Sequence, residues 1–255
     1  MNPRLDVLLR PQELDAATAV AIVVDVIRAS TSLVTLVERG AGPIYVAPTV
    51  DAARRAAAGA PQPMRIPPAG GSETRPLLIG EQDGLPPEGF DHGNSPAALA
   101  TASLAGRTVI FATTNGAPAL HAAAGAGTVL VGCLRNASAA AQAAWEAAED
   151  GGAVTVVCAG RSTNAGSFGV DDLYAGGVII ERILRLGPAT LLDGAEAAVL
   201  VSRAEPDGLG LFRRTAAGRH VAGLGLDADV IYSAEVDRSE VVPRLGRELF
   251  LLAES

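Results

Sequence analysis

Carboxylate side chains stand just beyond apolar segments in this 255-residue chain. Asp25 ends the run VVD, where a carboxylate suits a metal ligand or a nucleophile, but also a turn residue that bonds its own loop amides. Asp171 and Asp172 open a helical stretch as a second metal ligand or a water-orienting base, or simply as favourable charge at a helix N-terminus. Glu81, in GEQDG, is a third carboxylate candidate. These residue types predict metal-ion or acid–base chemistry.

Groups that suit an anion follow the first of these carboxylates. Arg28, Ser30 and Thr31 come directly after Asp25. Loop amides at a helix N-terminus, with an arginine beside them, form a ready anion site. Ser30 is at least as well explained as a plain helix N-cap. The segment therefore predicts an anion site. Whether the hydroxyls of Ser30 and Thr31 bind the anion or cap the helix stays open.

Three further segment ends carry groups that suit an oxyanion. In TTNG, Gly116 would let the backbone around Thr114 and Asn115 approach a phosphate closely, although many strand-to-helix turns look alike. Arg135 and Arg161 each follow a cysteine at a strand end, and a guanidinium binds phosphate, sulfonate or carboxylate by a two-pronged contact. Neither cysteine has the five-residue spacing to arginine that a cysteine phosphatase needs. We therefore expect the arginines, and not the thiols, to act on an anion.

Two residue types are rare, and this narrows the chemistry. The chain has no lysine, which excludes Schiff-base chemistry, pyridoxal-phosphate anchoring and the Walker-type phosphate loop. Its three histidines, His92, His121 and His220, are far apart in sequence, so a zinc site built on His and Cys is not expected. A metal here should be a hard cation held by carboxylates, amide oxygens and water, which points to Mg²⁺.

The charge and the apolar pattern exclude several classes of partner. The net charge is −8 and no basic run is present, so nucleic-acid binding is not expected. The N-terminal residues show no signal peptide, and the apolar runs are too short to span a bilayer. The two cysteines lie in apolar stretches and need not pair. The sequence therefore predicts a cytoplasmic protein with reduced thiols and no membrane partner.

A short β-branched run, a polar or Gly-rich loop and an Ala-rich stretch recur along the chain. The expected strands are 20–24, 43–47, 108–112, 128–132 and 153–157. The expected helices are 31–39, 50–58, 117–124, 138–149, 171–186 and 209–218, followed by a terminal stretch at 241–252. This alternation predicts a three-layer α/β/α fold with a mainly parallel sheet, whose polar loops meet at the carboxyl ends of the strands. We expect one domain over residues 1–255, or two closely packed lobes with the second from about residue 150.

The segment Gly70–Pro96 breaks this rhythm. It ends in GEQDGLPPEGFDHGNSP, and loops of such length are usually functional or disordered. Phe90 and the turn Asn94-Ser95-Pro96, which a helix follows, indicate an anchored loop. His92 within it suits a proton donor to a leaving group, or equally a residue that faces solvent.

Six stretches, in this order, resemble the 2-phosphosulfolactate phosphatase family over nearly the whole chain. They are VVDVIRASTSLVTLVERGA, LLIGEQDGLPPEGFDHGNSP, TTNGAPAL, GCLRNASA, VCAGRS with GSFGVDDLYAGG, and GLGLDADVIYSAEVDRSEVVP. The second stretch is quite specific, whereas TTNG alone is not. One departure concerns specificity: Gln82 and Asp83 follow Glu81 where the family usually has an arginine and then a basic residue or glycine.

The resemblance implies a magnesium-dependent acid phosphatase that converts 2-phospho-3-sulfolactate to 3-sulfolactate and phosphate, a biosynthetic step in organisms that make coenzyme M. By matching position it implies a carboxylate centre of Asp25, Glu81 and Asp171 or Asp172, with Mg²⁺ assigned to Asp25, Glu81 and Asp171. The implied anion binders are Arg28, Asn94, Ser95, Thr114, Asn115, Arg135 and Arg161. In-line attack by water, positioned by Asp25 or by the pair at 171–172, is the expected mechanism, with covalent attack by Asp25 as the alternative.

Two other functions stay open at this point. The chain could hydrolyse another small anionic phosphoester, because a family constrains chemistry better than it constrains substrate. It could also bind an anion without catalysis, although three carboxylates beside a phosphate exceed what binding requires. A homodimer is the ordinary expectation, because closed two-fold dimers are the commonest assembly.

Overall fold

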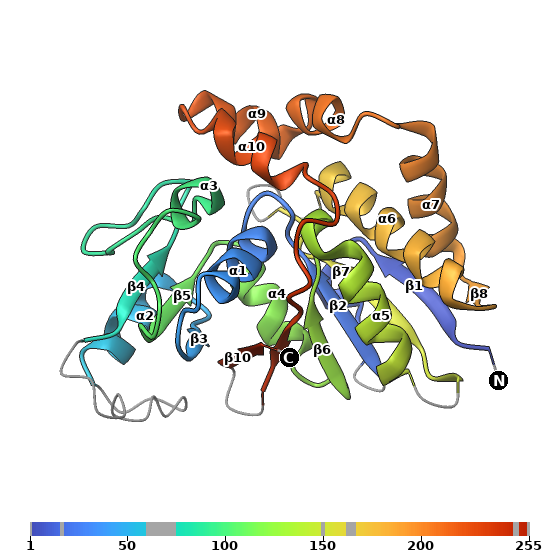
Figure 1. Cartoon of the computed structure of the whole chain (residues 1–255), viewed down its shortest axis with the longest axis horizontal. Helices are drawn as coiled ribbons and strands as arrows, with labels where there is room; N and C mark the ends of the chain where they lie inside the picture. The colour runs from blue at the N-terminus through green and yellow to red at the C-terminus, as the bar shows by residue number, and fades with distance from the viewer. Residues whose placement is uncertain are drawn as a thin grey trace.

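The computed structural model describes residues 2–15, 18–59, 75–148, 151–161, 167–246 and 250–253 (Figure 1). Its strands are β1 (Arg4–Leu8), β2 (Val20–Val24), β3 (Ile44–Val46), β4 (Leu77–Gly80), β5 (Val109–Ala112), β6 (Thr128–Val131), β7 (Val154–Cys158), β8 (Thr190–Leu191), β9 (Pro243–Leu245) and β10 (Phe250–Ala253). Its helices are α1 (Ala29–Glu38), α2 (Val50–Ala57), α3 (Pro96–Leu99), α4 (Gly116–Ala123), α5 (Ala137–Ala147), α6 (Val170–Leu186), α7 (Asp193–Ala204), α8 (Gly208–Arg214), α9 (Ala216–Gly223) and α10 (Asp227–Ser233), with short 3₁₀ turns at Pro11–Glu13 and Leu134–Asn136.

One sheet connects these strands in the order β4-β5-β3-β10-β9-β6-β2-β7-β1-β8. Both of its outer parts are parallel: β3, β4 and β5 on one side, and β6, β2, β7, β1 and β8 on the other. Between them, β9 and β10 pair antiparallel with each other and with their neighbours. The expectation of a mainly parallel α/β/α fold is confirmed, with one addition. The terminal stretch 241–252 contributes two antiparallel strands to the middle of the sheet. The second lobe expected from about residue 150 stays a prediction.

Strand β2 explains why both faces of the sheet are covered. All five of its residues are buried. Its side chains alternate between faces, as in any strand. Ile22 belongs to the core cluster that includes α5, α6 and α7, and Val23 belongs to the cluster that includes α1 and α4. A strand that is apolar on both faces needs helices on both, and Figure 1 shows this three-layer arrangement.

Three short helices, α8, α9 and α10, form a separate group at one end of the molecule (Figure 1). We call residues 208–233 the helical cap. A single helix was expected at 209–218, and the structure divides it. Thr215 has an extended backbone, and its side chain accepts a hydrogen bond from the amide of Gly218. It therefore ends α8 and begins α9 as an N-cap residue.

Helix α6 is the longest in the described structure, with 17 residues that pack between α5 and α7. It begins with Asp171 and Asp172, and its C-terminal half carries Glu181, Arg182 and Arg185. Across the described ranges, none of the helices combines the length and the apolar character that a membrane span requires.

Candidate functional site

A cavity of ≈ 160 Å³ lies where the loops after β2, β4, β5 and β7 meet the start of α6 and the helical cap. This volume suits a small ligand. Nine residues that the sequence singles out line it: Asp25, Arg28, Glu81, Asn94, Thr114, Asn115, Arg161, Asp171 and Asp172. As expected from the sequence, loops that are distant along the chain meet at the carboxyl ends of the strands, and these loops line the cavity.

Asp25 directly follows β2, and the residue is 9% exposed. Its backbone is fixed by Ser30, whose Oγ accepts a hydrogen bond from the Asp25 amide at 2.8 Å. Its Oδ1 accepts a hydrogen bond from the amide of Ala29 at 3.3 Å. Burial, and then the negative charge of Glu81, raise the pKa of the Asp25 carboxyl to about 7. The site therefore holds this carboxylate against a considerable electrostatic cost.

Asp171 and Asp172, in the first turn of α6, are both buried and play different parts. Asp172 Oδ1 accepts a hydrogen bond from the amide of Val26 at 2.8 Å. Its pKa is raised well above the ordinary value by burial and by the charges of Asp171 and Asp25. Burial also raises the pKa of Asp171, to about 6, although the charge of Arg161 opposes the rise. Asp172 is thus tied to the backbone of the β2 loop, whereas Asp171 lies beside an arginine that lines the cavity.

Glu81 connects the loops that follow β4 and β5. Its carboxylate accepts hydrogen bonds from the amide of Thr114 at 2.6 Å, from the Thr114 hydroxyl at 3.2 Å and from the amide of Gly84 at 2.8 Å. The carboxylate therefore has donors on both oxygens before any ligand binds. This geometry gives Glu81 a role in shaping the two loops, whether or not it also ligates an ion.

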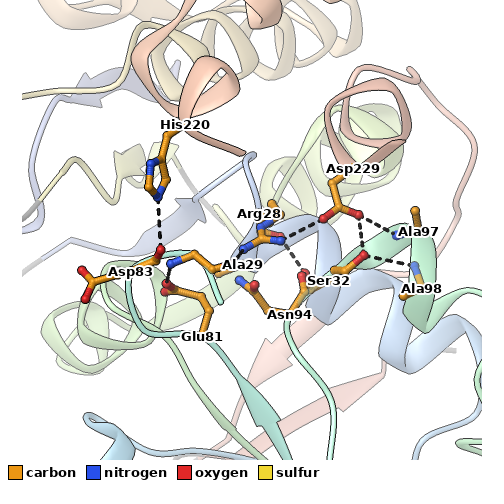
Figure 2. A network of polar contacts seen from close by, with 12 residues as sticks. Arg28, Ala29, Ser32, Glu81, Asp83, Asn94, Ala97, Ala98, His220 and Asp229 are labelled. Atoms are coloured by element: carbon orange, nitrogen blue, oxygen red, sulfur yellow. Dashed lines mark hydrogen bonds and ion pairs between the residues drawn. The ribbon is translucent and has the colours of Figure 1, made fainter. Parts of the chain in front are cut away.

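Arg28 and Asn94 also line the cavity, and Figure 2 shows the polar contacts around them. Arg28 forms a buried ion pair with Asp229 at 2.8 Å and donates to the carbonyl of Gly84 at 2.6 Å. The carbonyl of Asn94 accepts a hydrogen bond from Ser32 at 2.5 Å. Asn94 Oδ1 is buried and has no hydrogen-bond partner within the described ranges. A buried amide oxygen without a partner is a costly arrangement, and a bound ligand or cation would relieve it.

Four of the residues expected to bind an anion are not among those that line the cavity. They are Ser30, Thr31, Ser95 and Gly116. The hydroxyls of Ser30 and Thr31 donate to the carbonyls of Val23 and Val26, respectively. Both side chains therefore stabilise the backbone around the end of β2 and the loop that follows it. Gly116 allows a close approach instead. A Cβ at this position would stand 2.4 Å from the Cβ of Ala29 and 2.8 Å from Asp25 Oδ2. The hydroxyl of Ser95 donates to Asp229 Oδ1 at 2.6 Å.

Arg135 is the fifth expected anion binder that the structure places elsewhere. Its guanidinium lies over the ring of Tyr232, 3.9 Å from the centroid, and pairs with Glu235. A carboxylate oxygen of Glu38 lies 3.9 Å from a second nitrogen of the guanidinium. Both aromatic and acidic partners attract a guanidinium. Arg135 therefore attaches the helical cap to the 3₁₀ turn after β6. Its guanidinium, which was expected to bind substrate, is paired with these acidic and aromatic partners.

Sequence reasoning did not assign His220 and Asp229 to the site. His220, in α9, lines the cavity, and its Nε2 lies 3.2 Å from the carbonyl of Asp83. Asp83 and Gly84 both have positive φ, 54° and 86°, and form the tip of the loop after Glu81. His220 and Asp229 both lie in the helical cap, where residue type and spacing gave no sign of a role, although the sixth of the stretches that resemble the family includes Asp229. Neither Cys133 nor Cys158 lines the cavity, and burial raises the pKa of the Cys133 thiol to about 11.

The donors around the cavity suit a hard divalent cation. Carboxylates crowd together there, and an unpartnered amide oxygen stands beside them. Within the described part of the chain, no three His, Cys, Asp or Glu side chains are arranged as a ready-made metal cage. Mg²⁺ does not require one, because it usually keeps several waters and binds through one or two carboxylates and a substrate phosphate. The residues therefore fit Mg²⁺ and fit a metal that needs an all-protein cage less well.

The fold and the cavity together define an α/β protein whose acidic centre lies beside arginines that suit a small oxyanion. The family model for 2-phosphosulpholactate phosphatase matches residues 8–248. A Thermus thermophilus protein named probable 2-phosphosulfolactate phosphatase is 40% identical over 96% of this chain and 94% of its own length. A Deinococcus radiodurans protein of the same name is 39% identical over 89% and 87%, and one from Gloeobacter violaceus is 32% identical over 88% and 87%. The chain belongs to the 2-phosphosulpholactate phosphatase family, which confirms the resemblance.

Proposed function

We propose that this protein is a magnesium-dependent phosphatase that hydrolyses 2-phosphosulfolactate to 3-sulfolactate and phosphate. The observation that carries the proposal is the juxtaposition, in one cavity, of the Asp25, Asp171 and Asp172 carboxylates with the guanidiniums of Arg28 and Arg161. Relatives across most of the chain bear the name of this activity. A phosphoryl group needs both kinds of residue: cationic groups for its oxygens and carboxylates for a cation and for water.

The arginines would bind and orient the substrate. Arg28 and Arg161 come from loops after different strands, β2 and β7, so they can contact different oxygens of one ligand. Two guanidiniums that come from separate segments of the chain fix the orientation of a ligand better than two on one flexible loop. His220 and the amides near Thr114 and Asn115 would contact the remaining anionic groups. A substrate with phosphate, sulfonate and carboxylate matches this spread of donors.

The carboxylates would hold the cation and the attacking water. Asp25 and Asp171, with the amide oxygen of Asn94, would ligate Mg²⁺, which supplies charge neutralisation to a transferring phosphoryl group. Asp172 is tied to Val26 and would keep Asp171 in place. Asp25, which follows β2 directly, would orient a water for in-line attack. Covalent attack by Asp25 is distinguished by the stereochemistry at a chirally labelled phosphorus: a single in-line displacement by water inverts it, whereas two successive displacements through a phosphoryl-Asp25 intermediate retain it.

A substrate panel tests the proposal. We expect kcat/KM for 2-phosphosulfolactate to exceed that for 2-phospholactate, which lacks the sulfonate, by at least about tenfold, because a charged hydrogen bond contributes on the order of 1.5–3 kcal/mol. Equal values of kcat/KM for the two compounds would indicate that the substrates are a broader class of small anionic phosphoesters. No phosphate release from any member of the panel, by folded protein with Mg²⁺, would favour an anion-binding sensor. The proposed function would belong to the cytoplasm, and to coenzyme M synthesis where the organism makes that coenzyme.

A further inference from the structure

Asp229, in the first turn of α10, is a buried carboxylate that no part of the proposed mechanism uses. Its side chain is 1% exposed, although it belongs to the helical cap on the surface of the protein. A carboxylate is rarely buried so fully unless it is paired. Its partners come from two other segments of the chain, the loop after β2 and the start of α3.

The two oxygens of Asp229 have separate tasks (Figure 2). Oδ1 accepts from the hydroxyl of Ser95 at 2.6 Å and from the amide of Ala97 at 3.3 Å. These donors fix the plane of the carboxylate. Oδ2 is then directed to Arg28, whose NH1 donates to it at 2.8 Å. The carboxylate is thus held on one side and holds a guanidinium on the other.

Arg28 keeps donors for a ligand in this arrangement. A guanidinium has five N–H donors. One on NH1 bonds Asp229, and one on NH2 bonds the carbonyl of Gly84 at 2.6 Å. The group nevertheless lines the cavity. Two fixed contacts on different nitrogens determine the orientation of a planar group, so the remaining N–H bonds point in a fixed direction.

We propose that Asp229 is a positioning residue that sets the orientation of the Arg28 guanidinium toward a bound oxyanion, an inference that rests on the proposed function. Through it the helical cap completes the anion site without touching the anion. Simple charge considerations give the opposite expectation. A carboxylate beside Arg28 reduces the positive potential, so its loss would tighten anion binding if it acted through charge alone.

The test is a double-mutant cycle with inorganic phosphate as the probe, measured by isothermal titration calorimetry on the full chain with Mg²⁺ present. Asp229→Ala should weaken phosphate binding by at least about tenfold, and Asp229→Asn, which keeps one acceptor, should weaken it less. In an Arg28→Gln background, Asp229→Ala should change binding by less than about twofold, because the lost contact acts through Arg28. Asp227→Ala is the matched control, since that residue is in the same helical turn but pairs with Arg213 at the surface.

Three outcomes would overturn the inference: tighter phosphate binding by either Asp229 variant, unchanged binding by Asp229→Ala, or an equal loss in the Arg28→Gln background. Should Asp229→Ala fail to fold, Ser95→Ala provides the second variant, because it removes the shorter of the two hydrogen bonds to Oδ1 while leaving the ion pair. It should weaken phosphate binding only when Arg28 is present. Phosphate binding is measured without turnover, so absence of hydrolysis by the wild type would count against the proposed function and not against the role of Asp229.

Discussion

The amide of Val26 donates a hydrogen bond to Asp172 Oδ1 across 2.8 Å, although 146 positions separate the two residues in the chain. This bond joins the loop after β2 to the first turn of α6. It occupies one oxygen of Asp172 and places the adjacent Asp171 in the cavity that Asp25 lines. Two consecutive aspartates therefore divide the work, one as a structural acceptor and the other as a carboxylate available to a ligand.

This division predicts different effects for two substitutions. Asp172→Ala should lower the free energy of unfolding by about 1–3 kcal/mol at pH 6, because the buried amide of Val26 loses its acceptor. Asp172→Asn, which keeps an oxygen there, should cost less. Asp171→Asn should not lower the unfolding midpoint in urea, because it replaces a buried charge by a neutral group, but it should lower kcat by at least about a hundredfold. Chemical denaturation and steady-state kinetics on the same preparations distinguish the two roles. A loss of stability in Asp171→Asn together with unchanged stability in Asp172→Ala would contradict this division of roles.

The raised pKa values of the cavity carboxyls predict a stability that falls as pH rises in the absence of divalent cations. The pKa of Asp25 is about 7 in the folded protein against 3.8 ordinarily. The folded state therefore binds more protons between these values, and its free energy of unfolding falls through that window. For Asp25 alone the loss by pH 8 is on the order of 2–4 kcal/mol. Urea titrations with chelator from pH 4 to pH 8 measure it, and Asp25→Asn should flatten the curve. A wild-type curve as flat as the variant's would refute the prediction.

Mg²⁺ should stabilise the protein more at pH 8 than at pH 5. At pH 8 the carboxyls of Asp25 and Asp171 are ionised and repel each other, since their pKa values are about 7 and about 6. At pH 5 both are largely protonated, and protons compete with the cation. Thermal unfolding with and without Mg²⁺ at both pH values tests this. The Asp25→Asn variant should show a smaller shift at pH 8. An equal shift at both pH values would indicate that the cation binds elsewhere.

Arg161 and Arg135 form a matched pair for separating binding from structure. Arg161→Gln should lower kcat/KM by about tenfold to a hundredfold, with little change in stability, because its guanidinium lines the cavity. Arg135→Gln should leave kcat/KM within about threefold and lower the free energy of unfolding by about 1–3 kcal/mol, since it loses Tyr232 and a half-exposed Glu235. If Arg135→Gln lost much of its kcat/KM without losing stability, Arg135 would be an anion-binding residue and not a structural one.

The sequence predicts much of this architecture because local patterns determine it. The run 20–24 is short, apolar at every position and rich in valine and isoleucine, which indicates a strand buried on both faces, and β2 occupies those residues. A polar residue directly after such a strand lies at the ligand-binding edge of a parallel sheet, which is why Asp25 and Arg161 were found. The strands β1 and β8, and helix α7, lack comparably clear boundaries in the sequence and were not anticipated.

The residues that sequence reasoning assigned to the site, but that do not line the cavity, depend on contacts between distant segments. Arg135 and Arg161 look alike in sequence, each at a strand end after a cysteine. Only the folded chain shows that Tyr232, in the cap, covers the first of them. Asp229 is equally invisible, because an acidic residue in the first turn of a helix is ordinary. The side on which a cap packs, and therefore which charges it neutralises, is a tertiary property.

The most direct test of the central claim is phosphate release from 2-phosphosulfolactate by wild type and Asp25→Asn, each with Mg²⁺ and with a chelator. The account predicts release by the wild type that requires Mg²⁺, and a loss of at least about a thousandfold in the variant, whose fold is checked by circular dichroism. Undiminished release with the chelator, or from Asp25→Asn, would contradict a carboxylate and cation centre at this cavity.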